Sequence, residues 1–307
     1  MQRVTMTVLI FFASAGAMLP VLTGCGAPDA DNGRPIIFVS IPPQAYFADK
    51  LAGDRAAVHV LLPPGVDSHS YEPRPSQLQA LANASLYVRT GADFENASWD
   101  RIRGANRGMT VVDGREGVAL RHMTSEEAAG HSHGHDHGHA HDHGAGDPDP
   151  HIWLDPRNMQ RQVRQMSEAL QEIDPDNAEI YAEREAEIAA ELEALDEELR
   201  AILRPVEGKT FWVYHPAWGY FADAYGLRQA AIQQEGKDPG VQSMERLVRR
   251  AQAEGVSVIF GERQFDTRRA KVVADEIGAE VAELDPLAEN YPENLRAVAT
   301  AIRDAVS

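Results

Sequence analysis

Histidine is the residue whose spacing says most about the chemistry of this chain. Seven histidines alternate with small or acidic residues inside one internal segment, and an imidazole-rich segment of this composition has no apolar face that could pack in a core. Because imidazole is the commonest metal ligand in proteins, the pattern predicts an auxiliary metal-binding loop. A purification tag explains it less well, since the segment is internal and interrupted. The seven are His131, His133, His135, His137, His139, His141 and His143.

Three more histidines and one aspartate lie where a second, tighter site would be expected. His69, His215 and Asp285 each follow a predicted strand, and open parallel sheets bind their ligands beyond the carboxyl ends of strands. His151 comes from a loop before a predicted helix. Three imidazoles and one carboxylate form a tetrahedral set that suits Zn²⁺, with Zn–N distances of about 2.0 to 2.1 Å.

Each of these histidines has a simpler explanation, which is a hydrogen-bonded surface or loop residue. The equivalent positions of several of them favour the metal site. Two other histidines lack such a position, because His59 lies inside a predicted strand and His122 lies beside the histidine-rich segment. Neither is expected to be a ligand of the site.

The N-terminus predicts export and lipidation. A short basic start precedes an apolar run over residues 4–21, and Leu22-Thr23-Gly24-Cys25 closes it with small residues and the only cysteine of the chain. This pattern is typical of a lipoprotein signal peptide over residues 1–24, with lipid on Cys25 and a tether over residues 25–34. A single-pass membrane anchor is the alternative. A lone cysteine that carries lipid leaves none for a disulfide.

Charge and length exclude some functions and favour two domains. The 307 residues contain 29 Lys plus Arg against 47 Asp plus Glu, a net charge of −18, so there is no general basic field and nucleic acid is not an expected partner. Much of the acidic surplus falls within residues 168–200, as on a solvated helix face. Removal of residues 1–24 from 307 leaves 283 residues, enough for two hydrophobic cores.

The first half of the chain alternates between strand and helix patterns, which is typical of a parallel sheet covered by helices. This favours an N-terminal α/β domain over residues 35–156. The pattern fails from Glu116 to Pro150, a stretch too long for an ordinary connection, so it is expected to be an insertion. The expected strands cover residues 34–41, 58–62, 86–89 and 110–112, and the helices residues 45–51 and 75–83.

Residues 157–204 form a predicted helical segment, and the alternation resumes in a C-terminal α/β domain over residues 205–307. In the longer helix, residues 177–203, apolar side chains recur mostly every three or four positions. At 1.5 Å per residue this helix would span about 40 Å, long enough to link two domains rigidly. Its stripe comprises Ile180, Ile188, Leu192, Leu195, Leu199 and Leu203. The last domain is expected to have strands over residues 210–214, 229–233, 256–260 and 280–284, with helices over 218–225, 243–254, 267–277 and from 292.

Several segments, in order along the chain, resemble those of one protein family. The first is Leu-Pro-Pro-Gly-Val-Asp-Ser-His-Ser-Tyr-Glu-Pro at residues 62–73, and the others cover residues 91–95 with Trp99, 149–156, 214–220, 235–239 and 284–287. Together they are similar to the zinc and manganese solute-binding lipoproteins of ABC importers, the cluster A-I or ZnuA/TroA-like family. The resemblance covers essentially the whole chain after the signal peptide.

The resemblance implies two α/β domains, each with a mostly parallel sheet flanked by helices, joined by a long rigid backbone helix, with the metal site in the cleft between them. It implies that His69, His151 and His215 bind the metal and that Asp285 is the fourth ligand, although some relatives use water or another acid there. Manganese-binding relatives tend to have glutamate where this chain has His215, so histidine favours zinc. Ser68 departs from the proline often found before the first ligand.

The implied function is capture of Zn²⁺ and its delivery to an ABC-transporter permease, without catalysis. The protein would be a monomer in the periplasm or otherwise outside the cytoplasm, anchored to the membrane by its lipid. The histidine-rich loop would bind zinc weakly near the cleft, and the preformed site would bind it more tightly, since a flexible segment loses entropy when it is ordered.

Three alternatives remain open. One is a manganese or other divalent-metal protein of the same family, and another is a periplasmic zinc buffer whose main site is the histidine-rich loop. The third is a zinc hydrolase with a bound water, for which Glu72 and Glu262 are conceivable general bases. The chain lacks a His-Glu-x-x-His helix, and the simpler role for either glutamate is loop hydrogen bonding or surface charge.

Overall fold

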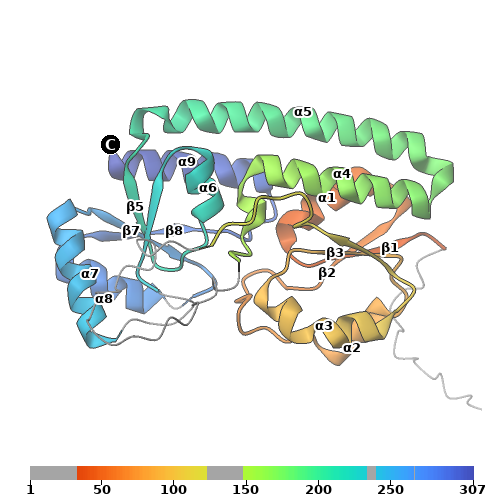
Figure 1. Ribbon diagram of the computed structural model, residues 1–307, viewed down its shortest axis with the longest axis horizontal. Coiled ribbons are helices and arrows are strands. Elements are labelled where there is room, and N and C mark those ends of the chain that lie inside the picture. Colours follow the sequence, from red (N-terminus) through yellow and green to blue (C-terminus); the bar gives the residue numbers. More distant parts are fainter. Residues whose placement is uncertain (1–32, 123–147, 234–239, 266) are drawn as a thin grey trace, which may run out of the picture. The chain divides into compact units, whose positions relative to one another are not determined.

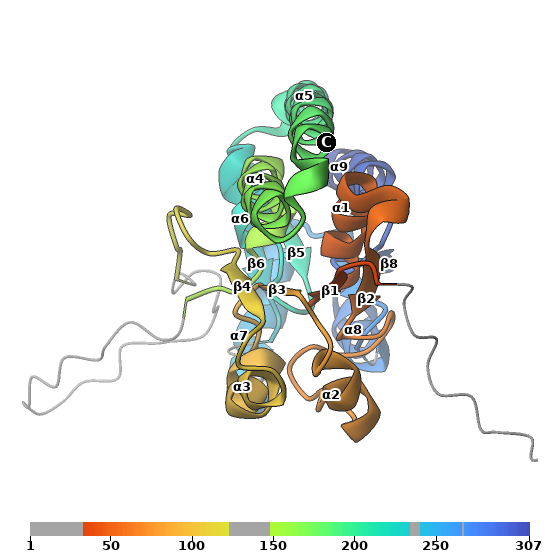
Figure 2. The same cartoon turned by 90° about the vertical axis from the view of Figure 1, so that its right-hand side faces the viewer.

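The computed structural model describes residues 33–122, 148–233, 240–265 and 267–307, and it contains two four-stranded sheets. Every strand pair in both sheets is parallel. The inner strands of such a sheet are buried on both faces and carry apolar runs; the first strand, Ile-Ile-Phe-Val, lies between β2 and β3 and is an example. Figure 1 shows the two sheets with their helices, and Figure 2 shows the helix layers end-on.

The N-terminal sheet has the strand order β2-β1-β3-β4. Helix α1 packs against β1 and β2 on one face, and α2 and α3 pack against each other on the opposite side (Figure 2). Its elements are β1 (Ile36–Val39), α1 (Pro42–Ala52), η1 (Gly53–Arg55), β2 (Ala57–Val60), α2 (Pro75–Leu81), β3 (Leu86–Arg89), α3 (Asp93–Ala105) and β4 (Thr110–Asp113).

Helix α3 is an element that the sequence pattern did not predict. Its buried face carries Phe94, Glu95, Ser98 and Ile102, so polar residues interrupt the apolar stripe on which such a prediction depends. The helix begins at a buried carboxylate: Glu95 Oε2 accepts hydrogen bonds from the backbone N–H groups of Thr90 at 3.0 Å and Ala92 at 3.0 Å. A glutamate at this position of the first turn accepts from the N–H of the residue that caps the helix, here Ala92.

The C-terminal sheet has the strand order β6-β5-β7-β8. Helix α8 packs against β7 and β8, whereas α6 and α9 contact β6 and β5. The predicted strands and helices are all present, with ends shifted by a few residues. They are β5 (Thr210–Val213), α6 (Gly219–Ala224), β6 (Arg228–Ala231), α7 (Val241–Glu254), β7 (Val258–Glu262), α8 (Thr267–Ile277), β8 (Glu280–Leu284) and α9 (Tyr291–Val306).

Two helices connect the sheets. η2 (Ile152–Leu154) leads into α4 (Pro156–Ile173), η3 (Pro175–Asn177) precedes the 26-residue α5 (Ala178–Leu203), and η4 (Arg204–Val206) follows it. α5 lies along α4 and contacts α1 at one end and α9 at the other (Figure 1). The predicted stripe is buried from Ile188 to Leu203, with Tyr181 buried in place of Ile180.

The predicted fold class is therefore confirmed. The described residues from 34 onward form one compact unit, and one hydrophobic core cluster includes residues of both sheets and of α5. The boundaries at residues 156 and 204 stay predictions.

Several predicted features lie outside the described residues. These are the signal peptide, Cys25, the seven-histidine segment and the family segment at residues 235–239. On either side of the histidine-rich segment, residues 116–122 and 148–150 form no helix or strand. Within the described ranges no helix has the length and apolar character needed to cross a membrane.

Candidate metal centre

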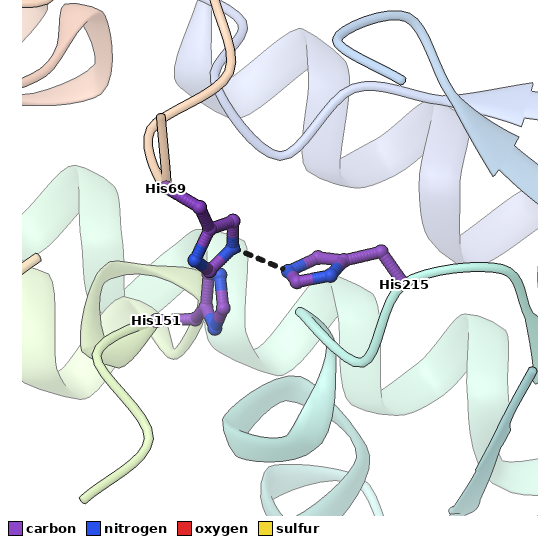
Figure 3. Close-up of side chains that lie close together, drawn as sticks. All are labelled: His69, His151 and His215. Carbon is purple, nitrogen blue, oxygen red and sulfur yellow. Dashed lines mark hydrogen bonds between the residues drawn. The ribbon is translucent and has the colours of Figure 1, made fainter. Parts of the chain in front are cut away.

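The side chains of His69, His151 and His215 converge (Figure 3). One ring nitrogen from each lies within 4.8 Å of the others. The Nε2 atoms of His69 and His215 are 3.1 Å apart. In a tetrahedral zinc site with bonds of about 2.05 Å, two ligand nitrogens are about 3.3 Å apart, so this pair already has nearly the spacing that zinc requires.

Each histidine is held by local structure in a different part of the chain. His69 lies in the loop between β2 and α2, where its backbone N–H donates to Asp67 Oδ1 at 2.8 Å. His151 directly precedes η2, and its backbone N–H donates to Asp149 Oδ1 at 3.0 Å. His215 follows β5 by two residues. The group thus combines the N-terminal sheet, the connection to α4 and the C-terminal sheet.

The second nitrogen of every ring has an oxygen partner. Nδ1 of His69 lies 2.6 Å from Asp93 Oδ2, and Nδ1 of His151 lies 2.7 Å from Asp149 Oδ1. Nδ1 of His215 lies 3.1 Å from Gln233 Oε1. Since a carboxylate or amide oxygen only accepts, each Nδ1 donates, and each Nε2 offers a lone pair to a metal whenever it carries no proton.

The surroundings of His69 and His215 shift their pKa values in opposite directions. Burial lowers the pKa of His215 well below its usual 6.5, and the two neighbouring imidazoles add to the effect. Burial also opposes protonation of His69, but the hydrogen bond and charge of Asp93 outweigh it and raise its pKa. The hydrogen bond from His69 in turn lowers the pKa of Asp93. The site therefore combines one neutral imidazole with one that readily holds a proton.

Asp285, the predicted fourth ligand, is not among the groups that converge in the described part of the chain. It directly follows β8, and its Oδ1 accepts hydrogen bonds from Gln264 Nε2 at 2.7 Å and from the Leu287 N–H at 2.9 Å. Both partners lie in the wall of a small cavity that His151 and His215 also line. Asp285 thus borders the site.

That cavity, of ≈ 10 Å³, is lined by Glu262, a residue whose environment the sequence did not predict. Glu262 lies at the end of β7 and is only 1% exposed. Neither carboxylate oxygen has a partner in hydrogen-bonding geometry among the described residues. The Trp218 indole lies near enough to favour the ionised carboxylate and so to lower its pKa in part. Burial raises the pKa of Glu262 well above its usual range. The prediction of a surface or loop role for Glu262 was therefore wrong.

Glu72, the other conceivable general base, lies in a different environment. Its side chain is 82% exposed and pairs with Arg101 at 3.8 Å. The two other described histidines are also exposed: His59 stacks on Phe38 with ring centroids 5.1 Å apart, and His122 lies at the start of the histidine-rich segment. None of these three side chains belongs to the converging group.

Comparison with known proteins identifies the family of the chain. The sequence model of the family described as ZnuA, zinc-uptake complex component A, periplasmic, matches residues 37–305. The chain belongs to this family. The resemblance drawn from the ordered sequence segments is thereby confirmed.

Two curated relatives and one solved structure show how far the family likeness extends. The high-affinity zinc uptake system protein ZnuA of Paracoccus denitrificans (strain Pd 1222) is 32% identical, over 94% of this chain and 97% of its own. The protein of the same name from Bacillus subtilis (strain 168) is 31% identical, over 85% and 81%. A crystal structure of a ZnuA deletion mutant lacking residues 138–173 with zinc bound, in its own numbering, is 39% identical, with a TM-score of 0.79 over 89% of this chain and 98% of that one.

Proposed function

We propose that this protein captures Zn²⁺ outside the cytoplasm and delivers it to an ABC-type membrane permease. The observation that carries the proposal is the convergence of three imidazoles whose Nδ1 atoms all have acceptors, so that the Nε2 atoms of His69, His151 and His215 can bind one ion. A site arranged in this way loses little entropy when the metal arrives. Two relatives named for high-affinity zinc uptake support zinc as the cargo.

Asp285 is the proposed fourth ligand. It follows β8 in the same sheet edge at which His215 follows β5, and the residues after it line the shared cavity. With three nitrogens and one oxygen the site would be borderline in character, which suits zinc better than manganese. Its carboxylate would also offset part of the charge of the ion.

The proposed location and the auxiliary loop rest on the sequence. The pattern ending at Cys25 supports a lipid anchor on the outer side of a membrane. The seven alternating histidines support a loop that binds zinc weakly and raises its concentration near the site. The protein would act as a monomer.

A zinc hydrolase is the second candidate, because the unpartnered carboxylate of Glu262 lines the same cavity as His151 and His215. A general base would need such a position. However, the cavity between these side chains, ≈ 10 Å³, is about the size of one water molecule, and two relatives that cover most of the chain are named for zinc uptake. Transport without catalysis therefore agrees better with these observations.

Metal analysis with a competing chelator tests the proposal. Wild-type protein, a variant lacking residues 122–145, and His215→Ala would each be titrated with zinc. We expect the shortened variant to retain one tight site and His215→Ala to lose it. His59→Ala, which changes an exposed histidine outside the site, is the matched control. Loss of the tightest site on removal of residues 122–145 would instead identify a zinc buffer, and an unchanged site in His215→Ala would contradict the proposed ligand set.

A further inference from the structure

Arg121 joins two carboxylates beside the proposed site. Its Nη1 donates to Asp149 Oδ2 at 2.8 Å, and its Nε donates to Asp223 Oδ2 at 2.9 Å. The Arg121 side chain is 11% exposed and that of Asp149 0%, whereas Asp223 is 63% exposed. The buried half of this network is the important one, because an exposed ion pair contributes little stability.

The backbone of Arg121 is held as firmly as its side chain. The Arg121 N–H donates to the hydroxyl of Tyr220 at 3.0 Å, and the Arg121 carbonyl accepts from the Asp149 N–H at 2.9 Å. Arg121 and Asp149 flank the histidine-rich segment in the sequence. Tyr220 and Asp223 belong to α6. A single residue thus ties the two ends of the insertion to each other and to a helix of the C-terminal half.

Gly219, the first residue of α6, makes room for this contact. A Cβ atom added there would lie 1.6 Å from Arg121 Nη1 and 2.9 Å from Asp149 Oδ2. Any side chain at position 219 would therefore displace the guanidinium from Asp149. The absence of a side chain at position 219 is a condition for the network.

Asp149 connects Arg121 to His151, a proposed ligand of the metal. Its Oδ2 accepts from Arg121, while its Oδ1 accepts from both the Nδ1 and the backbone N–H of His151. The helix that holds the other end of the network begins four residues after His215. The network therefore runs from the segment that carries His215, through Arg121 and Asp149, to the ring of His151.

We propose that Arg121 is a positioning residue for the metal site, which sets the orientation of His151 relative to His215 through Asp149. The inference rests on the proposed function. Without the guanidinium, Asp149 would be a buried carboxylate with one partner fewer, free to turn its oxygens, and His151 would lose its fixed acceptor. The metal would then have to order the ligand on binding.

Zinc affinity tests the role, measured on the full chain at one equivalent of metal against a competing chelator. Loss of an outer-sphere partner of a metal-binding histidine typically lowers affinity about 10–100-fold, and we expect a loss in this range for Arg121→Met. Arg249→Met removes the same charge from an arginine whose side chain is 68% exposed on α7, and it should leave zinc affinity unchanged. Equal losses in both variants would attribute the effect to net charge and overturn the proposal.

Gly219→Ala is a second route to the same result, and it leaves every charged group in place. It should weaken zinc binding as Arg121→Met does, because the new Cβ occupies the position of the guanidinium. Gly104→Ala is its control, since a Cβ there meets nothing within 4 Å. Wild-type affinity in Gly219→Ala, with the protein folded, would overturn the proposal even if Arg121→Met failed to fold.

A double-mutant cycle separates positioning from general stability. In a His151→Ala background, Arg121→Met should cost no further zinc affinity, because its effect passes through that ring. The visible spectrum of bound Co²⁺ should also change in Arg121→Met at full occupancy. Additive losses with an unchanged Co²⁺ spectrum would show a structural role only. If His215→Ala binds zinc as wild type does, the proposed function itself fails, whatever Arg121 does.

Discussion

The Nε2 atoms of His69 and His215 lie 3.1 Å apart, so one of these nitrogens donates a proton to the other. The pKa of His69 is raised and that of His215 is lowered, so His69 is the ring of this pair that holds a proton more readily. Zinc bound at the proposed site would have to displace such a proton, because a protonated nitrogen has no lone pair for a metal. The contact that spaces the two rings for a metal therefore also makes metal binding compete with protons.

Zinc affinity should accordingly depend on pH, and protonation of His69 should make it weaker at low pH. As pH falls through the raised pKa of His69, which lies above 6.5, the proton competes more strongly and affinity decreases. His215 should contribute only at much lower pH, since its pKa is depressed. Competition titrations between about pH 8 and pH 5.5 would measure the onset. An affinity independent of pH over this range would show that histidines are not the ligands.

Asp93→Asn sharpens this test. Asp93 raises the pKa of His69 through its hydrogen bond and charge, so the variant should begin to lose zinc at a lower pH than wild type. Zinc affinity at high pH should also decrease about 10-fold or more, because asparagine is a weaker acceptor for Nδ1. Asp100→Asn, on the same helix, is the control. An unchanged onset would assign the proton to another group.

His151→Ala should lower zinc affinity severely and leave the metal-free protein folded. A lost ligand should cost more than the about 10–100-fold that follows loss of an outer-sphere partner. The fold should persist because His151 lies in a connection between elements and Asp149 keeps its hydrogen bond to Arg121. Loss of the buried imidazole partner of Asp149 should still lower the free energy of unfolding by about 1–3 kcal/mol. Calorimetry would measure zinc binding and circular dichroism the fold. Wild-type binding of the tightest zinc would exclude His151 from the site.

His215→Glu should narrow the selectivity for zinc over manganese. The change replaces a borderline nitrogen donor by a hard, charged oxygen donor and leaves the other proposed ligands in place. Zinc affinity should fall more than manganese affinity, but zinc should still bind more tightly, because its intrinsic affinity is higher at almost any mixed site. Titration of both metals into the variant lacking residues 122–145, with and without His215→Glu, gives the ratio. An unchanged ratio would place selectivity elsewhere.

Glu262→Gln should remove a pH dependence from the stability of the metal-free protein. Because burial raises the folded-state pKa of Glu262, the folded protein holds a proton that the unfolded chain releases above about pH 4.3. Wild-type stability should therefore fall as pH rises from there toward the folded-state pKa, whereas the variant, which resembles the protonated form, should lack this component. Urea unfolding between about pH 5 and pH 7 would show it. Parallel curves for both proteins would mean that Glu262 is ionised in the folded state.

The sequence by itself determined most of the architecture. Strand and helix periods are local, so the alternating elements, the stripe from Ile188 to Leu203 on α5 and the positions of His69 and His215 after strands could be predicted. The identity of the family also followed from ordered segments. Helix α3 was missed because Glu95 and Ser98 occupy its buried face. Apolar periodicity identifies a buried helix face only where the buried residues are apolar, so polar residues on that face conceal the helix.

Only the tertiary structure decided the hydrogen-bond partners and the burial of the residues at the proposed site. Asp93 and Gln233, the acceptors for two of the imidazoles, are separated from their histidines by 24 and 18 residues, and Arg121 reaches Asp149 across 28. Such pairings depend on how strands and helices pack, which no local pattern encodes. The burial of Glu262 likewise follows from the neighbours of β7 and not from its own segment. Residue types thus predicted a metal site, whereas packing decided which imidazole nitrogens converge and which charges surround them.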